Sequence, residues 1–243
     1  MARPVRGPVQ APSLVRWERD GAVAVIRISG FDSRTGDQLR SAVKAATARA
    51  AAPLEGLVLD LRGNVGGLLD MAEQVAGLAL PEGAVIGTLR GRTPDNVRAL
   101  RARAPLLPND VTLVVLVDNR SAAGAEIVAA ALQDHGRALL IGAKTLGAGT
   151  IQTVMPLPAE QGALVITTAR VHRANGVGLD ALGVTPDMML DEATRRVTVR
   201  EDIAGGFNGA LLQRVRDAVA HAPAGTEVAL LAARIALTHA HAD

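Results

Sequence analysis

The 243-residue chain contains no cysteine, which excludes disulfide bonds and thiolate metal sites and leaves the redox compartment open. Aromatic residues are nearly absent too: Trp17, Phe31 and Phe207 make up 1% of the chain. This scarcity argues against a nucleic-acid platform, which needs stacked aromatic rings. The core must therefore be built from Leu, Val, Ile and Ala.

Lysine and net charge are also low, since Lys44 and Lys144 are the only lysines and the net charge is +2. So weak a charge gives little reason to expect DNA or an anionic membrane as partner. No run reaches the ~18–20 continuous apolar residues of a membrane span, so we do not expect an integral membrane protein. Residues 1–13 have no apolar core and predict a linker or the start of an engineered chain rather than a signal peptide.

Residues 14–243 are long enough for one domain with a full core. Short apolar, β-branched runs alternate with helical patterns, which indicates an α/β fold with a largely parallel sheet. The predicted strands are 22–29, 56–61, 111–117, 138–141, 150–156 and 163–170, and the predicted helices are 35–50, 68–80, 123–135, 208–221 and 226–240. Residues 84–90 and 95–103 predict a hairpin or a strand followed by a helix.

A glycine-rich turn, Arg-Gly-Asn-Val-Gly-Gly at 62–67, follows a buried strand and precedes a helix. Paired glycines there allow backbone N–H groups to stabilise an oxyanion or bind an anion. On its own the turn is explained more simply by the need for positive φ or close packing.

Three further segments follow in order: Ser-Ala-Ala-Gly-Ala-Glu at 121–126, Leu-Gly-Ala-Gly at 146–149, and a closing Gly-Val-Thr-Pro-Asp at 183–187. With the glycine-rich turn, they resemble the tail-specific, or C-terminal processing, serine proteases over about residues 20–190. That family carries Asn-Pro-Gly-Gly, Ser-Ala-Ser-Ala-Ser-Glu and Phe-Gly-Lys-Gly with a following glutamine. The resemblance implies the spiral of ββα units shared with Clp proteases and crotonases.

The resemblance also assigns roles to particular residues. It puts the nucleophile on Ala123, the lysine base on Ala148 and the supporting glutamine on Gln152. It further implies that Gly66, Gly67 and Gly124 form the oxyanion or peptide-binding backbone. No cofactor or metal is implied.

Two alanines cannot supply the chemistry of a Ser–Lys pair, so we expect peptide hydrolysis to be absent. Ser121 and Lys144 are the nearest substitutes. A two-residue offset at the start of a helix points a side chain elsewhere, so they are expected to be an N-cap serine and a solvated lysine. Thr145 and Thr150 have no obvious base beside them.

The histidines offer no stronger alternative. His135 is expected at a helix C-terminus, where it complements the dipole. His172 would need a serine partner for a catalytic triad. His239, His241 and Asp243 could chelate a metal loosely, but they lie at the chain tip.

Three functions remain open. The first is a catalytically inactive homologue (a pseudoprotease) that binds a peptide, a protein C-terminus or a protein partner such as an active protease. The second is an active enzyme inactivated by engineered Ser-to-Ala and Lys-to-Ala changes, and the third is a small-molecule or lipid binder.

The family resemblance implies a periplasmic or cell-envelope location. A homo-oligomer through the apolar stripes of 208–240 also stays open, but such stripes more often pack on their own domain.

Overall fold

The structure, a computed structural model, describes residues 14–48, 53–158, 162–200 and 209–239. Its strands are β1 (Val15–Asp20), β2 (Val23–Ile28), β3 (Gly56–Asp60), β4 (Val85–Arg90), β5 (Val97–Arg101), β6 (Thr112–Val117), β7 (Leu139–Gly142), β8 (Thr150–Pro156), β9 (Ala163–Arg173), β10 (Met188–Asp191) and β11 (Arg196–Val199). Its helices are α1 (Thr35–Ala48), α2 (Leu69–Ala76), α3 (Gly124–Asp134), α5 (Gly209–His221) and α6 (Val228–His239), with a 3₁₀ turn at Gly77–Ala79.

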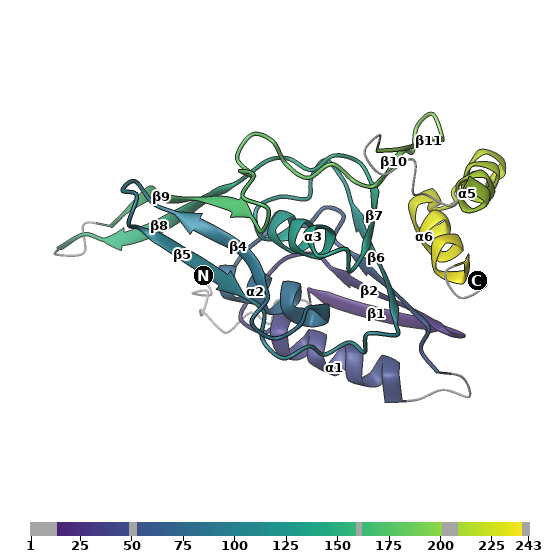
Figure 1. The fold of residues 1–243 in the computed structure, drawn as a ribbon, viewed down its shortest axis with the longest axis horizontal. Coiled ribbons are helices and arrows are strands. Elements are labelled where there is room, and N and C mark those ends of the chain that lie inside the picture. Colours follow the sequence, from purple (N-terminus) through teal and green to yellow (C-terminus); the bar gives the residue numbers. More distant parts are fainter. Residues whose placement is uncertain (1–13, 49–52, 159–161, 201–208, 240–243) are drawn as a thin grey trace, which may run out of the picture.

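A seven-stranded sheet forms the centre of the molecule, in the order β1-β2-β3-β6-β7-β10-β11 (Figure 1). The strands from β2 to β10 run parallel, and β1 and β11 close the two edges as antiparallel strands. The expected α/β class with a largely parallel sheet is therefore confirmed.

Both faces of this sheet are buried, because its central strands alternate their side chains between two cores. On β6, Leu113 and Val115 join the core beneath α1, α2 and α3, whereas Val114 and Leu116 join the core beneath α5 and α6. Strands covered on both faces are continuously apolar, which is why this strand was recognisable in the sequence.

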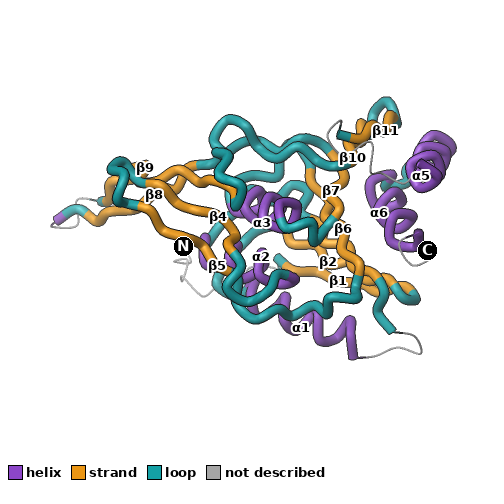
Figure 2. The backbone as a smooth tube through the Cα atoms, viewed as in Figure 1, coloured by secondary structure: helices purple, strands orange, loops and turns teal. Residues whose placement is uncertain are grey.

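A second, four-stranded antiparallel sheet in the order β5-β4-β9-β8 lies beside the first and projects from the body (Figure 2). Of the two alternatives for 84–103, the structure selects the hairpin, with β4 and β5 antiparallel. Among the described residues, no helix is long and apolar enough to cross a bilayer.

The closing Gly-Val-Thr-Pro-Asp segment is tied to the body through Asp187, which is almost fully buried. Its carboxylate accepts hydrogen bonds from Gln133 Nε2 at 2.7 Å and from the Leu140 amide at 2.9 Å. Asp187 thus joins the end of the motif to α3 and β7, a structural rather than a chemical role.

Several element predictions need correction. β1, β10 and β11 were not predicted: β1 carries four charged residues among its six, and the other two are only four residues long. The helix predicted at 68–80 ends as an α-helix at Ala76 and continues as the 3₁₀ turn. The last residues of the helix predicted at 35–50 and the predicted linker 1–13 lie outside the described residues.

Candidate active site

The loop between β6 and α3 ends in a strained elbow at Ala123. This residue has φ 49° and ψ −111°, a conformation that is unusual for any residue except glycine. Such backbone strain costs on the order of 1–3 kcal/mol and persists only where the surroundings hold it. Ala123 is partly exposed, directly before the first residue of α3.

The Glu126 side chain, which is fully buried, holds this elbow against the loop that contains Ala148. Its Oε2 accepts the amide of Ala123 at 2.9 Å and the amide of Ala148 at 2.8 Å. Its Oε1 accepts the Thr145 hydroxyl at 2.5 Å and the Gly147 amide at 2.6 Å. The Ala123 and Ala148 amides donate to the same oxygen. The distance between their nitrogens therefore cannot exceed the sum of the two hydrogen-bond lengths, which keeps the elbow and the loop close together.

Asn64 anchors the glycine-rich turn beneath the elbow. Asn64 is fully buried. Its Nδ2 donates to the Ile28 carbonyl at 2.9 Å, and its backbone carbonyl oxygen accepts the Ala122 amide at 2.9 Å. Its Oδ1 accepts the Gly66 amide at 2.8 Å, so that amide is already engaged within the protein. Asn64 therefore joins the end of β2, the turn and the elbow.

The glycines of the site approach the elbow closely. A Cβ added to Gly66, whose φ is 97°, would lie 2.9 Å from both the Ala123 Cβ and the Gly124 nitrogen. Gly67 has φ 140°, and a Cβ there would lie 2.1 Å from the Phe31 carbonyl oxygen. Among the described residues, the amides of Gly67 and Gly124 have no hydrogen-bond acceptor, the second because it begins α3.

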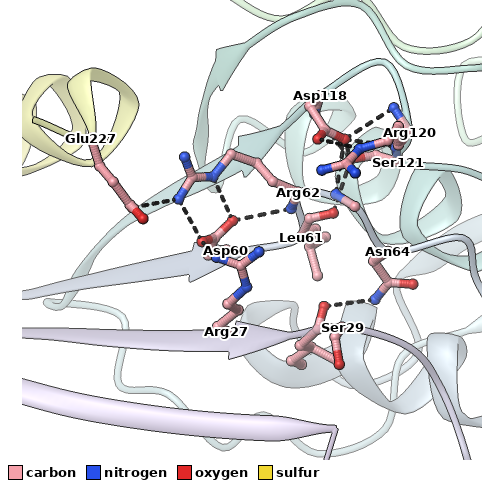
Figure 3. Close-up of polar contacts among 12 residues, drawn as sticks. Arg27, Ser29, Asp60, Leu61, Arg62, Asn64, Asp118, Arg120, Ser121 and Glu227 are labelled. Atoms are coloured by element: carbon pink, nitrogen blue, oxygen red, sulfur yellow. Dashed lines mark hydrogen bonds and ion pairs between the residues drawn. The ribbon is translucent and has the colours of Figure 1, made fainter. Parts of the chain in front are cut away.

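Asp118 organises the backbone of the loop that leads to the elbow (Figure 3). Its Oδ1 accepts the amides of Gly63, Arg120 and Ser121 at 2.9, 3.0 and 2.9 Å. Burial by itself raises the pKa of Asp118, but the backbone hydrogen bonds from Gly63 and Arg120 and the Ser121 hydroxyl outweigh it, so this pKa lies below its ordinary value.

Ser121 does not cap α3, contrary to expectation. Its hydroxyl is fully buried and donates to the Leu61 carbonyl at 2.9 Å. The N-cap residue is Ala123, two positions later, which has no side-chain acceptor. A hydroxyl already engaged below the loop cannot replace a nucleophile at the elbow.

An ion-pair network lies next to this loop at the end of β3 (Figure 3). Arg62 donates to Asp60 at 2.8 Å and to Glu227, just before α6, at 3.0 Å. The hydrogen bond to the Asp60 carboxylate raises the pKa of Arg62, and the Glu227 carboxylate adds to the effect. This network ties α6 to the central sheet.

Lys144 is exposed, as expected. It lines a cavity of about 700 Å³ together with Arg62, Asp118 and Ala229 of α6, a cavity to which neither Ala123 nor Ala148 contributes. Lys144 therefore does not stand in for a base at position 148.

Gln152 is exposed on β8, directly after an irregularity in the pairing with β9. Within the described part of the chain its side chain has no hydrogen bond, so the structure does not connect it to Ala123. The structure thus brings Ala123 and Ala148 together on Glu126, whereas no hydrogen bond among the described residues links Gln152 to them.

The histidines lie outside this constellation. His135 is the C-cap of α3, and its Nε2 lies 2.8 Å from the Val85 carbonyl oxygen. His172 lies on β9, opposite Thr88 of β4. The His239 side chain, His241 and Asp243 are outside the described residues. Within the described ranges, no group of three or more His, Asp or Glu side chains is arranged for a metal ion.

Sequence reasoning did not assign a role to Glu126, Asn64 or Asp118. A signal existed for Glu126: it stands three residues after the N-cap, where a glutamate returns to the cap amide in a capping box. Its bonds to residues 145–148 had no such signal, because those residues follow a different strand.

The fold and the site together define an α/β protein in which a strained elbow opens a helix, an arrangement that hydrolases use to present a nucleophile. The family model for Peptidase family S41 matches residues 22–190. The chain belongs to this family.

Individual relatives agree. The chain is 37% identical over 179 residues to the carboxy-terminal-processing protease of Bartonella bacilliformis, covering 73% of this chain and 41% of that protein. It is 34% identical over 172 residues to the carboxyl-terminal-processing protease of Synechocystis sp., covering 70% and 38%. The solved photosystem II D1 C-terminal processing protease superposes with a TM-score of 0.63 at 28% identity, over 75% of this chain and 49% of that one. The chain thus spans less than half the length of each.

Proposed function

We propose that this chain is a non-catalytic member of family S41 that binds an extended peptide segment, such as a protein C-terminus. The observation that carries the proposal is the elbow itself: its backbone geometry is kept, with alanine at the two positions that the family resemblance assigns to nucleophile and base. A scaffold kept without its reacting groups favours binding over hydrolysis.

The absence of turnover follows from the chemistry of the two side chains. A methyl group at position 123 can neither attack a carbonyl carbon nor form an acyl intermediate, and a methyl group at 148 accepts no proton. Backbone donors alone leave roughly 10³–10⁴-fold acceleration over water. That is far below useful protease turnover.

Peptide binding is supported by what surrounds the elbow. The free amides of Gly67 and Gly124 can donate to a peptide carbonyl or a terminal carboxylate. Val65, Leu68 and Leu146 are three large apolar side chains on the loops around the site, and each is more than half exposed. Apolar side chains beside free backbone donors suit an extended apolar segment.

Natural loss of the reacting groups is favoured over engineered inactivation. An engineered inactive variant usually changes one catalytic residue. Here Val65, Gly124, Ala125 and Leu146 also depart from the family pattern. Departures distributed over the whole site are expected where selection for catalysis has relaxed.

The test combines hydrolysis and binding on the same preparation. Incubation with fluorogenic unstructured peptides should give no cleavage, and labelled peptides with apolar C-termini should bind with saturation in fluorescence anisotropy. Leu146→Glu should weaken this binding at least about tenfold because it places a charge beside the site. Val97→Glu, at a position on β5 that is also more than half exposed, is the matched control and should bind normally.

Back-substitution separates old from recent inactivation. The double variant Ala123→Ser/Ala148→Lys should stay silent if the site has drifted, whereas robust cleavage would indicate that only these two residues were removed. Cleavage by the unaltered chain, or failure to bind any peptide, would overturn the proposal. Native mass spectrometry that finds a co-purified lipid or small molecule would assign the site to that ligand instead.

A further inference from the structure

The second sheet ends in a two-stranded ribbon that has no neighbouring strand on either side among the described residues. β4 pairs with β9 only over Arg170–Arg173, so the rest of β9 pairs with β8 alone. We define the arm as residues 152–158 and 162–167. Figures 1 and 2 show it projecting away from the central sheet.

The arm is exposed along its whole length and mostly apolar. Every one of its residues is exposed, and none is charged. Six large apolar side chains on it are between 36% and 62% exposed: Val154, Met155, Leu157, Leu164, Val165 and Ile166. An isolated two-stranded ribbon is marginally stable in water, and apolar surface of this extent marks an interaction site.

The strand register divides these side chains between two faces. Met155 pairs with Leu164 and Thr153 pairs with Ile166, which puts three large apolar residues on one face. On the opposite face, the Val154–Val165 pair lies between the polar Gln152–Thr167 pair and the smaller Pro156–Ala163 pair. The face with Met155, Leu164 and Ile166 is therefore the more apolar one.

We propose that the partner of this face is a second copy of the chain, with the arm of each copy packed face to face on the arm of the other around a two-fold axis. In an isologous contact, both copies use the same surface patch. A face without charged side chains can pack against an identical face without like-charge repulsion. It also supplies both arms with the packing that each lacks.

A single extended peptide does not meet the same need. It can hydrogen-bond to the open edge of β8, but it leaves the side chains on the β9 half of the face in water. The helices α5 and α6 do not compete for the dimer, because their buried residues, such as Val215, Val219 and Ala232, already form a core with the central sheet. This places self-association on the arm rather than on the C-terminal helices.

Sedimentation velocity on the full chain tests the proposal. The unaltered chain should be dimeric at tens of micromolar, and Leu164→Glu should raise the dimer dissociation constant at least about tenfold. Val165→Glu, the matched control on the opposite face, should change it by less than about threefold. Equal effects of both variants, or a monomer at every concentration, would overturn the proposal.

Cross-linking provides a second measurement that does not disturb folding. Because the chain has no cysteine, Met155→Cys, Leu164→Cys and Val165→Cys each carry a single thiol. A short bismaleimide should join Met155→Cys or Leu164→Cys into a dimer and leave Val165→Cys monomeric. If Leu164→Glu abolishes peptide binding in a monomeric chain instead, the arm belongs to the ligand and the dimer is refuted, whereas the proposed peptide binding stands.

Discussion

Glu126 is the residue whose removal should expose most clearly how the site is held. Glu126→Ala leaves four donors without their acceptor, and two of them, the Thr145 hydroxyl and the Gly147 amide, are in buried bonds. Hydrogen bonds to a charged group contribute ~1.5–3 kcal/mol each, and orphaned buried donors have a further desolvation cost. Since the two partly buried amides can regain water, we expect a loss of about 3–5 kcal/mol in the free energy of unfolding.

Glu126→Gln should be only a partial rescue. A glutamine keeps the shape of the side chain and one acceptor oxygen. Its NH₂ group can only donate, so the two donors that face it are left without an acceptor. We expect a loss of roughly 2 kcal/mol or more for this variant.

The assay is urea unfolding followed by far-ultraviolet circular dichroism, with the slope against denaturant checked for constancy. In thermal unfolding, the alanine variant should melt roughly 10 °C lower, given ~2–4 °C per kcal/mol at this chain length. Glu82→Gln, an exposed glutamate, is the control and should stay within about 0.5 kcal/mol. Wild-type stability in Glu126→Ala would refute the argument that this carboxylate holds elbow and loop together.

Two further predictions concern the backbone around the elbow. Gly67→Ala should destabilise the chain by more than ~2 kcal/mol, because the new Cβ would collide with the Phe31 carbonyl. The control is Gly83→Ala, where φ is 80° but the space is open, so that this variant shows only the positive-φ cost of roughly 1 kcal/mol. Equal urea midpoints for the two variants would contradict the clash. The second concerns pH. Because the pKa of Asp118 is lowered in the folded state, its contribution to stability is complete above the unfolded pKa of about 3.9 and is lost as the pH falls through the lower folded value. The stability difference between wild type and Asp118→Asn should therefore shrink below about pH 4, and a difference that is constant with pH would count against it.

The sequence was informative wherever one element carries its own signal. Strands β3 and β6 are covered on both faces and are therefore continuous apolar runs, which made them recognisable. β1 was missed because it is an edge strand whose polar side chains give no such run: even its single aromatic residue, Trp17, is 45% exposed. Edge strands are selected by pairing with a neighbour, which a local pattern does not encode.

In the candidate site, too, the sequence indicated what is local and missed what depends on distant partners. The ordered motifs located the elbow and the loop, and showed alanine at 123 and 148. They assigned oxyanion donation to Gly66, Gly67 and Gly124 alike, whereas in the structure the Gly66 amide is engaged by Asn64. That hydrogen bond depends on side-chain direction, and no spacing rule specifies it.

By itself the sequence determined the α/β class, the order of the motifs along the chain and the presence of alanine at positions 123 and 148, because residue identity and apolar periodicity are local properties. Only the tertiary structure decided that one buried carboxylate joins the elbow to the loop after β7, that the Ser121 hydroxyl is engaged by the Leu61 carbonyl, and that the β8–β9 arm has no further strand beside it among the described residues. Each of these depends on which distant segments the parallel crossovers bring together, and on which surfaces they leave without a neighbour.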